Sequence, residues 1–201
     1  MGARTVGIYN RAFLYDTSTS AFTGLGTLGG NTSIAYGIND TGTIVGSSSS
    51  SSGWSRAFQY SGGVMTSLGT LLGGSTGQSH TRAINNIGQI VGWSNFGFGF
   101  AAFLYDAGVM TNLNSMIDPF LGITVRDAYG ISNNGAIIAR STDERAYLLT
   151  PLDWTPEGAG GGEVPEPSAA ALALSGGLAA AAVSANRRHR RQKHRPASAA
   201  R

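Results

Sequence analysis

The sequence contains no cysteine, and only one of its three histidines, His80, lies before residue 187. No disulfide can therefore stabilise the fold, and the clustered histidine, cysteine and carboxylate ligands of a zinc site are missing. The sequence also lacks the Asp-x-Asp-x-Asp-Gly loop of a calcium site. We expect neither a metal site nor a cofactor.

Catalytic signatures are equally scarce. Paired carboxylates and histidines do not recur at equivalent positions, so general acid–base chemistry has no candidate residues. Residues 24–29 fit Gly-x-Gly-x-x-Gly and residues 73–77 fit Gly-x-Ser-x-Gly, but helical periodicity is absent before residue 168, so neither opens a predicted helix. We predict that the chain is not an enzyme, and an exported enzyme is the least favoured hypothesis.

The first 153 residues instead contain a repeat of about 45 residues. Aromatic residues at positions 13, 58, 103 and 147 lie in Ala-Phe-Leu-Tyr-like runs and are spaced by 45, 45 and 44 residues. The units start near residues 11, 56, 101 and 145. An Ile-Asn-x-x-Gly-x-Ile-Val-Gly-like segment recurs at 36–46, 82–92 and 129–139, and a Leu-Gly-Thr-Leu segment at 25–28 and 68–71 decays to Leu113-Asn114.

Each unit has the chemistry of two β-hairpins. Aromatic and β-branched runs are typical of short strands, and the Asn/Asp/Gly clusters between them are typical of turns. Four strands in about 45 residues suit a blade of a β-propeller. We predict an all-β, β-propeller-like domain over residues 1–153. It is expected to form a partial ring, because three full units and a partial one are few for a closed propeller of about four to eight blades. Its exposed strand edges invite pairing with another chain.

The units resemble the HAF repeat of bacterial extracellular proteins. The opening triplet reads Arg-Ala-Phe twice, Ala-Ala-Phe once and Arg-Ala-Tyr once, and the likeness covers roughly residues 4–152. The resemblance implies an exported, propeller-like module and carries no catalytic residues.

Two tryptophans, Trp54 and Trp93, follow Val-Gly elements beside the Gly- and Ser-rich residues 47–53 and 96–100. If they lie on loops at one rim of the propeller, they are candidates for stacking on sugar rings. Packing between adjacent blades is the favoured alternative.

A composition change marks the end of the repeat. Pro156 and the glycines at 158–162 predict a flexible linker over 154–163. The motif Val164-Pro165-Glu166-Pro167 follows, and then an uncharged, Ala-rich stretch, 168–185. As a helix these eighteen residues would be about 27 Å long, close to the thickness of a bilayer core. We therefore expect a transmembrane helix over 168–186.

The end of the chain is strongly basic. Residues 1–186 carry seven Lys/Arg and eleven Asp/Glu, a charge of −4, whereas residues 187–201 carry seven Lys/Arg and no acid, a charge of +7. Positive residues are held on the cytoplasmic side of a membrane, so the body is expected outside. Nucleic-acid binding would explain neither the apolar neighbour nor the lack of aromatics. A solvated, disordered tail is the other alternative. The basic cluster comprises Arg187, Arg188, Arg190, Arg191, Lys193 and Arg195.

The order of these segments resembles the PEP-CTERM sorting signal of Gram-negative bacteria, over roughly residues 164–195. The resemblance implies export by the Sec machinery, transient retention in the inner membrane, and recognition at Val164-Pro165-Glu166-Pro167 by an exosortase that cleaves nearby. It further implies release to the cell surface or the extracellular space of bacteria that make exopolysaccharide and form biofilms.

The first residues complicate this interpretation. Arg4-Thr5-Val6-Gly7 aligns with Thr43-Ile44-Val45-Gly46, so Met1 falls inside a repeat, and no basic region followed by an apolar run indicates a signal peptide. We expect that the chain is an N-terminally shortened version of a longer protein. The sequence thus predicts a non-enzymatic exported surface or matrix protein, with a carbohydrate-binding module of the envelope as the alternative.

Overall fold

The structure, a computed structural model, describes residues 2–6, 9–151 and 178–181. These residues form strands joined by turns and two short 3-10 helices, η1 (Leu113–Ser115) and η2 (Pro119–Leu121), and none of them lies in an α-helix. The all-β prediction is therefore confirmed.

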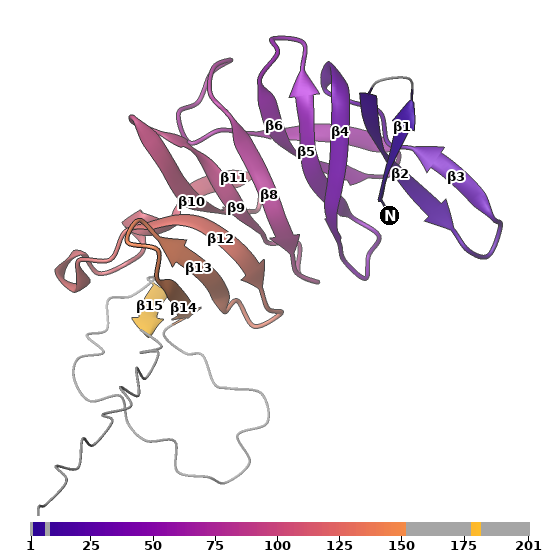
Figure 1. Ribbon diagram of the computed structural model, residues 1–201. Helices are drawn as coiled ribbons and strands as arrows, with labels where there is room; N and C mark the ends of the chain where they lie inside the picture. Colours follow the sequence, from indigo (N-terminus) through magenta and orange to yellow (C-terminus); the bar gives the residue numbers. More distant parts are fainter. Residues whose placement is uncertain (1, 7–8, 152–177, 182–201) are drawn as a thin grey trace, which may run out of the picture.

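The strands form four antiparallel sheets, which follow one another in a curved row (Figure 1). The first sheet comprises β1 (Gly2–Val6), β2 (Tyr9–Asp16) and β3 (Ala21–Gly24). The second comprises β4 (Gly29–Ile38), β5 (Ile44–Ser50), β6 (Ser55–Ser61) and β7 (Val64–Gly69). The third comprises β8 (Ser79–Ile84), β9 (Ile90–Phe96), β10 (Gly99–Asp106) and β11 (Val109–Asn112). The fourth comprises β12 (Val125–Ile131), β13 (Ile137–Ser141), β14 (Ala146–Pro151) and β15 (Leu178–Ala181). Among the described residues these sheets do not close into a ring.

Most of the C-terminal predictions fall outside the described residues, namely the linker 154–163, the motif 164–167 and the basic cluster 187–195. Of the helix expected over 168–186, only Leu178–Ala181 are described, and they form β15, paired with Leu148 to Pro151 of β14. This pairing supplies hydrogen bonds to an edge strand that would otherwise lack them. Within the described part of the chain, no helix has the length and apolar character needed to cross a bilayer.

The sheets begin two strands later than the sequence units. The unit that starts at residue 56 contributes β6 and β7 to the second sheet and β8 and β9 to the third. The units that start near residues 11, 56 and 101 each belong to two sheets, and the Leu-Gly-Thr-Leu segments are crossovers between sheets. Ser48 and Ser94 hold these crossovers, because their hydroxyls accept hydrogen bonds from the backbone N–H groups of Leu28 (2.9 Å) and Leu71 (3.0 Å).

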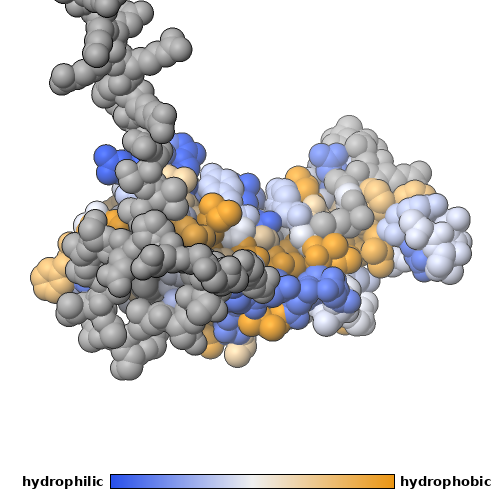
Figure 2. Space-filling model, turned by 90° about the horizontal axis from the view of Figure 1, so that it is seen from below, coloured by the Kyte–Doolittle hydropathy of each residue, from blue (hydrophilic) through white to orange (hydrophobic). Residues whose placement is uncertain are grey.

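The hydrophobic core lies between consecutive sheets. One cluster joins the second and third sheets and includes Val45, Phe103 and Ile90, and a second joins the third and fourth sheets around Val91, Ile137 and Leu149. Apolar side chains also reach the surface, and Figure 2 shows them gathered in the middle of one face, between hydrophilic side chains.

The glycine of each Ile-Val-Gly segment is required by close packing. A Cβ on Gly46 would overlap the carbonyl oxygen of Ile34 and lie 2.6 Å from the ring of Phe58, and a Cβ on Gly92 would overlap the carbonyl oxygen of His80. In the first sheet, Gly2 lies opposite Phe13, as Gly46 lies opposite Phe58.

The predicted alignment of Gly7 with Gly46 is therefore wrong. The pairing of Val6 with Tyr9 sets a register in which the equivalent position falls five residues earlier, at Gly2.

Candidate functional site

The first strands of three consecutive sheets, β4, β8 and β12, each contain a β-bulge at the same place. The pairing with the second strand skips one residue between Ala35 and Gly37, between Thr81 and Ala83, and between Ala128 and Gly130. The residues left unpaired are Tyr36, Arg82 and Tyr129. We call these three residues the bulge row. Bulges re-aim side chains and often lie beside functional sites.

The bulge row is accessible. Tyr36 is 40% exposed, Tyr129 is 43% exposed, and the Arg82 side chain is 36% exposed. The strands that carry them contact one another in the order β4, β8, β12, so the three side chains come from adjacent strands. The guanidinium carbon of Arg82 lies 5.2 Å from the centre of the Tyr129 ring, a distance typical of a cation–π interaction.

Arg82 also forms an ion pair across two sheets. Its Nη2 lies 2.8 Å from Oδ2 of Asp127, and its Nε donates to the same carboxylate at 3.3 Å. Asp127 is buried, with 8% of its surface exposed. The hydrogen bonds to Asp127 are the main reason that the pKa of Arg82 is raised, and burial acts in the opposite direction. The pair therefore presents a polar but electrically neutral group beside the tyrosines.

An aromatic cluster continues the site along the third sheet. The rings of His80 and Trp93 are stacked with centroids 4.4 Å apart, and Phe100 meets Trp93 edge-on at 4.8 Å. Burial is the main cause that lowers the pKa of His80, the positive charge of Arg82 adds to it, and Asp127 partly offsets both. The lowered pKa favours the neutral form of the His80 imidazole. Aromatic rings with a few fixed polar groups are typical of the lining of a small-molecule site.

The two predicted tryptophans occupy different environments. Trp54 is 40% exposed in the turn between β5 and β6, where its carbonyl accepts the N–H of Ser50 at 2.9 Å. Trp93 lies in strand β9, so it does not meet the condition of lying on a rim loop. Its neighbours His80 and Phe100 belong to the same sheet, so these ring contacts of Trp93 lie within one sheet.

The bulge row was not predicted as a site, although each member opens an Ile-Asn-x-x-Gly-like segment. Tyr, Arg and Tyr at this one position of three successive units is the signal that could have identified it. These three residues are equivalent because each is the unpaired residue of a bulge, and a bulge arises only when the strand pairs with its neighbour.

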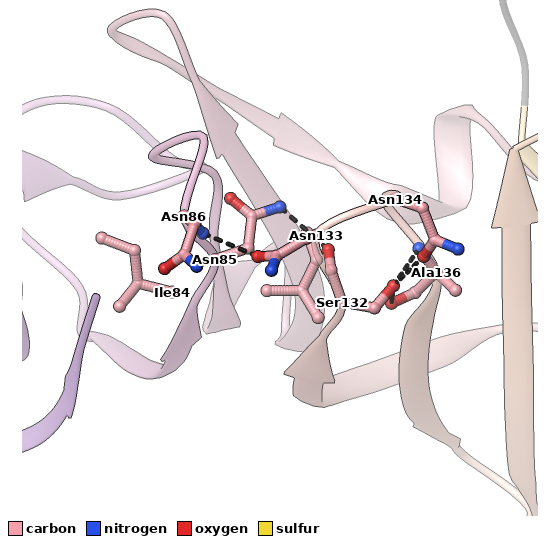
Figure 3. Close-up of a pocket in the computed structure, with 8 residues that line it drawn as sticks. Ile84, Asn85, Asn86, Ser132, Asn133, Asn134 and Ala136 are labelled. Atoms are coloured by element: carbon pink, nitrogen blue, oxygen red, sulfur yellow. Dashed lines mark hydrogen bonds between the residues drawn. The ribbon is translucent and has the colours of Figure 1, made fainter. Parts of the chain in front are cut away.

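One surface depression is explained by hydrogen bonds between neighbouring turns. It encloses about 540 Å³ between the β8–β9 and β12–β13 turns (Figure 3), and its lining includes Asn85, Asn86 and Asn133. Asn85 Oδ1 accepts the N–H of Gln89 at 2.9 Å, and its Nδ2 donates to the carbonyl of Ser132 at 3.0 Å. Asn133 accepts the N–H of Asn86 in the same way, at 2.9 Å. These amides hold one turn against the next, in agreement with their interpretation as turn residues.

Within residues 2–6, 9–151 and 178–181, no group of three or more His, Cys, Asp and Glu residues is placed to hold a metal ion. The buried carboxylate of Asp127 is instead paired with Arg82. Comparison of the chain with protein-family models, with curated proteins and with solved structures gives no match.

Proposed function

We propose that the chain is a non-enzymatic exported protein of the cell surface or extracellular matrix, sorted through residues 164–195 by an exosortase. The main support for this proposal is the order of a Pro-Glu-Pro motif, an uncharged apolar stretch and a basic cluster in the sequence. In this proposal the Sec machinery exports the body, residues 168–186 hold it in the inner membrane, and the basic cluster stays in the cytoplasm.

We propose further that the repeat body is a partial β-propeller. The arrangement of the complete sheets supports this, because β4 to β7 and β8 to β11 each follow sequence order across a four-stranded antiparallel sheet. Consecutive sheets also bury their cores against each other, as propeller blades do.

The sorting proposal is tested by the C-terminal peptide of the protein expressed in an exosortase-containing bacterium. Mass spectrometry should find a new terminus near Glu166-Pro167 in the envelope and secreted fractions. The variant Glu166→Ala should retain the full tail, and Glu163→Ala, just outside the motif, should be processed like the parent. Intact tails on the protein exported behind an added Sec signal peptide would refute sorting.

A second candidate function is carbohydrate binding on the envelope, linked to exopolysaccharide. The cluster of Trp93, His80 and Arg82 on one sheet favours it. Glycan arrays of the protein and of the Trp93→Ala and Trp54→Ala variants test this function.

A further inference from the structure

We infer that the bulge row, Tyr36, Arg82 and Tyr129, binds an uncharged polysaccharide chain that runs across three sheets. The inference rests on the proposed carbohydrate-binding function and specifies its site and its ligand class. It differs from stacking at Trp54 or Trp93, because the contacting residues lie at one equivalent position of β4, β8 and β12.

The geometry suits an extended ligand. Each bulge leaves one residue unpaired per sheet, and neighbouring first strands contact each other, so the row places its three residues on adjacent strands. Tyrosine supplies a rigid amphipathic face at low entropic cost, which fits the apolar faces of successive sugar rings. A polymer, unlike a monosaccharide, can occupy all three positions at once.

The hydrophobic core does not explain these residues. The clusters between the sheets are built from other side chains, such as Phe103, Ile90 and Val91. Both tyrosines of the row keep about two fifths of their surface exposed, at 40% and 43%.

Charge argues for an uncharged ligand. Residues 1–151 carry seven arginines, no lysine and seven Asp/Glu, so the repeat region has a net charge of zero. The charge of Arg82, the one cation in the row, is compensated by Asp127 at 2.8 Å. An anionic polymer would find no uncompensated cation there, and it would gain little from long-range attraction.

Hydrogen-bonding groups remain available for sugar hydroxyls. Nε and Nη2 of Arg82 are directed at Asp127, whereas Nη1 has no recorded hydrogen bond among the described residues. The hydroxyl of Tyr36 has only a long contact, 3.5 Å, with Ser47 Oγ. Donors fixed in place by an ion pair give orientation and specificity.

Titration calorimetry of the full-length chain tests the inference, with neutral gluco-oligosaccharides of two to six units and with oligogalacturonates as probes. We expect affinity for the neutral series to rise with length. Tyr36→Ala and Tyr129→Ala should each weaken binding about tenfold or more, while circular dichroism shows that both variants keep the parental fold. Tyr15→Ala is the matched control, because Tyr15 is a 38% exposed tyrosine outside the row.

Each of the other outcomes would overturn the inference. Neutral glycan binding that is lost in Trp54→Ala or Trp93→Ala but unchanged in both tyrosine variants would leave the carbohydrate function standing and overturn the bulge row. Preference for the oligogalacturonates would overturn the uncharged ligand class. Binding of neither series by the folded protein would overturn the carbohydrate-binding function together with this inference.

Discussion

The imidazole of His80 lies face to face with the indole of Trp93, with an interplanar angle of 14°. Burial in this stack is the main cause of the lowered pKa of His80, with Arg82 contributing and Asp127 opposing. The folded protein consequently binds the histidine proton at a lower pH than the unfolded chain does. Stability must therefore fall when the pH drops below about 6.5, the ordinary pKa of histidine.

This pH dependence gives the first prediction. The free energy of unfolding, measured with urea at pH 7.5 and at pH values down to about 5, should decrease for the parent protein. His80→Gln should flatten this decrease, because the side chain no longer titrates. His189→Gln, in the basic tail, should keep the parental profile. An equal decrease in the parent and in His80→Gln would show that another group is responsible.

The second prediction concerns the glycine beneath the bulge. Gly92→Ala places a methyl group on the carbonyl oxygen of His80, which is backbone and cannot rotate away. We expect the free energy of unfolding to fall by about 3 kcal/mol. Gly99→Ala in the same sheet meets no atom within 4 Å and is the control. Equal effects of the two variants in chemical denaturation would contradict the packing argument.

The third prediction concerns the serine that joins the second and third sheets. The buried Ser79 hydroxyl accepts the N–H of Ala57 at 3.0 Å and donates to the carbonyl of Gly69. Ser79→Ala leaves the buried N–H of Ala57 and the partly buried carbonyl of Gly69 without this partner and should cost about 1–3 kcal/mol. Ser61→Ala, at an exposed position of β6, should change stability by less than about 0.5 kcal/mol. Thermal unfolding followed by circular dichroism can compare the two.

The fourth prediction concerns the turns at the rim. Asn85→Ala removes the bond from Nδ2 to Ser132 and the bond from Gln89 to Oδ1, and it should cost about 2 kcal/mol because Asn85 is 3% exposed. Asn133→Ala removes one exposed hydrogen bond and should cost less than about 1 kcal/mol. If hydrogen exchange shows equal loosening of both turns in the two variants, burial does not determine the effect.

Sequence reasoning identified the strands and the turns because their signals are local. β-Branched and aromatic residues predicted the strands, although only part of a strand such as Ile90–Phe96, and the Asn/Gly clusters predicted the turns. The sheet boundaries were not predicted correctly. Which two hairpins combine into one sheet depends on pairing between strands that are distant in the sequence, and no local pattern shows this pairing. Glycines around Trp93 suggested a loop, whereas Gly92 serves strand packing.

Trp93 was the one residue of the site named from the sequence. His80 and Arg82 lie on a neighbouring strand of the same sheet. Asp127, which pairs with Arg82, lies in the next sheet, 45 positions away from Arg82. No local pattern in the sequence predicts such an ion pair. The bulges at Arg82 and Tyr129 are likewise a property of paired strands and not of either strand alone.

The two-strand offset between units and sheets has an evolutionary consequence. Suppose that a unit such as residues 56–100 is duplicated in tandem. The first hairpin of the new copy then pairs with the second hairpin of the unit before it, and its second hairpin pairs with the first hairpin of the unit after it. Every existing strand thus keeps a suitable neighbour. One duplication therefore inserts one whole sheet and one further bulge residue. The length of the bulge row, and with it the number of sugar units that the proposed surface can contact, can be lengthened or shortened by copy number without redesigning any sheet.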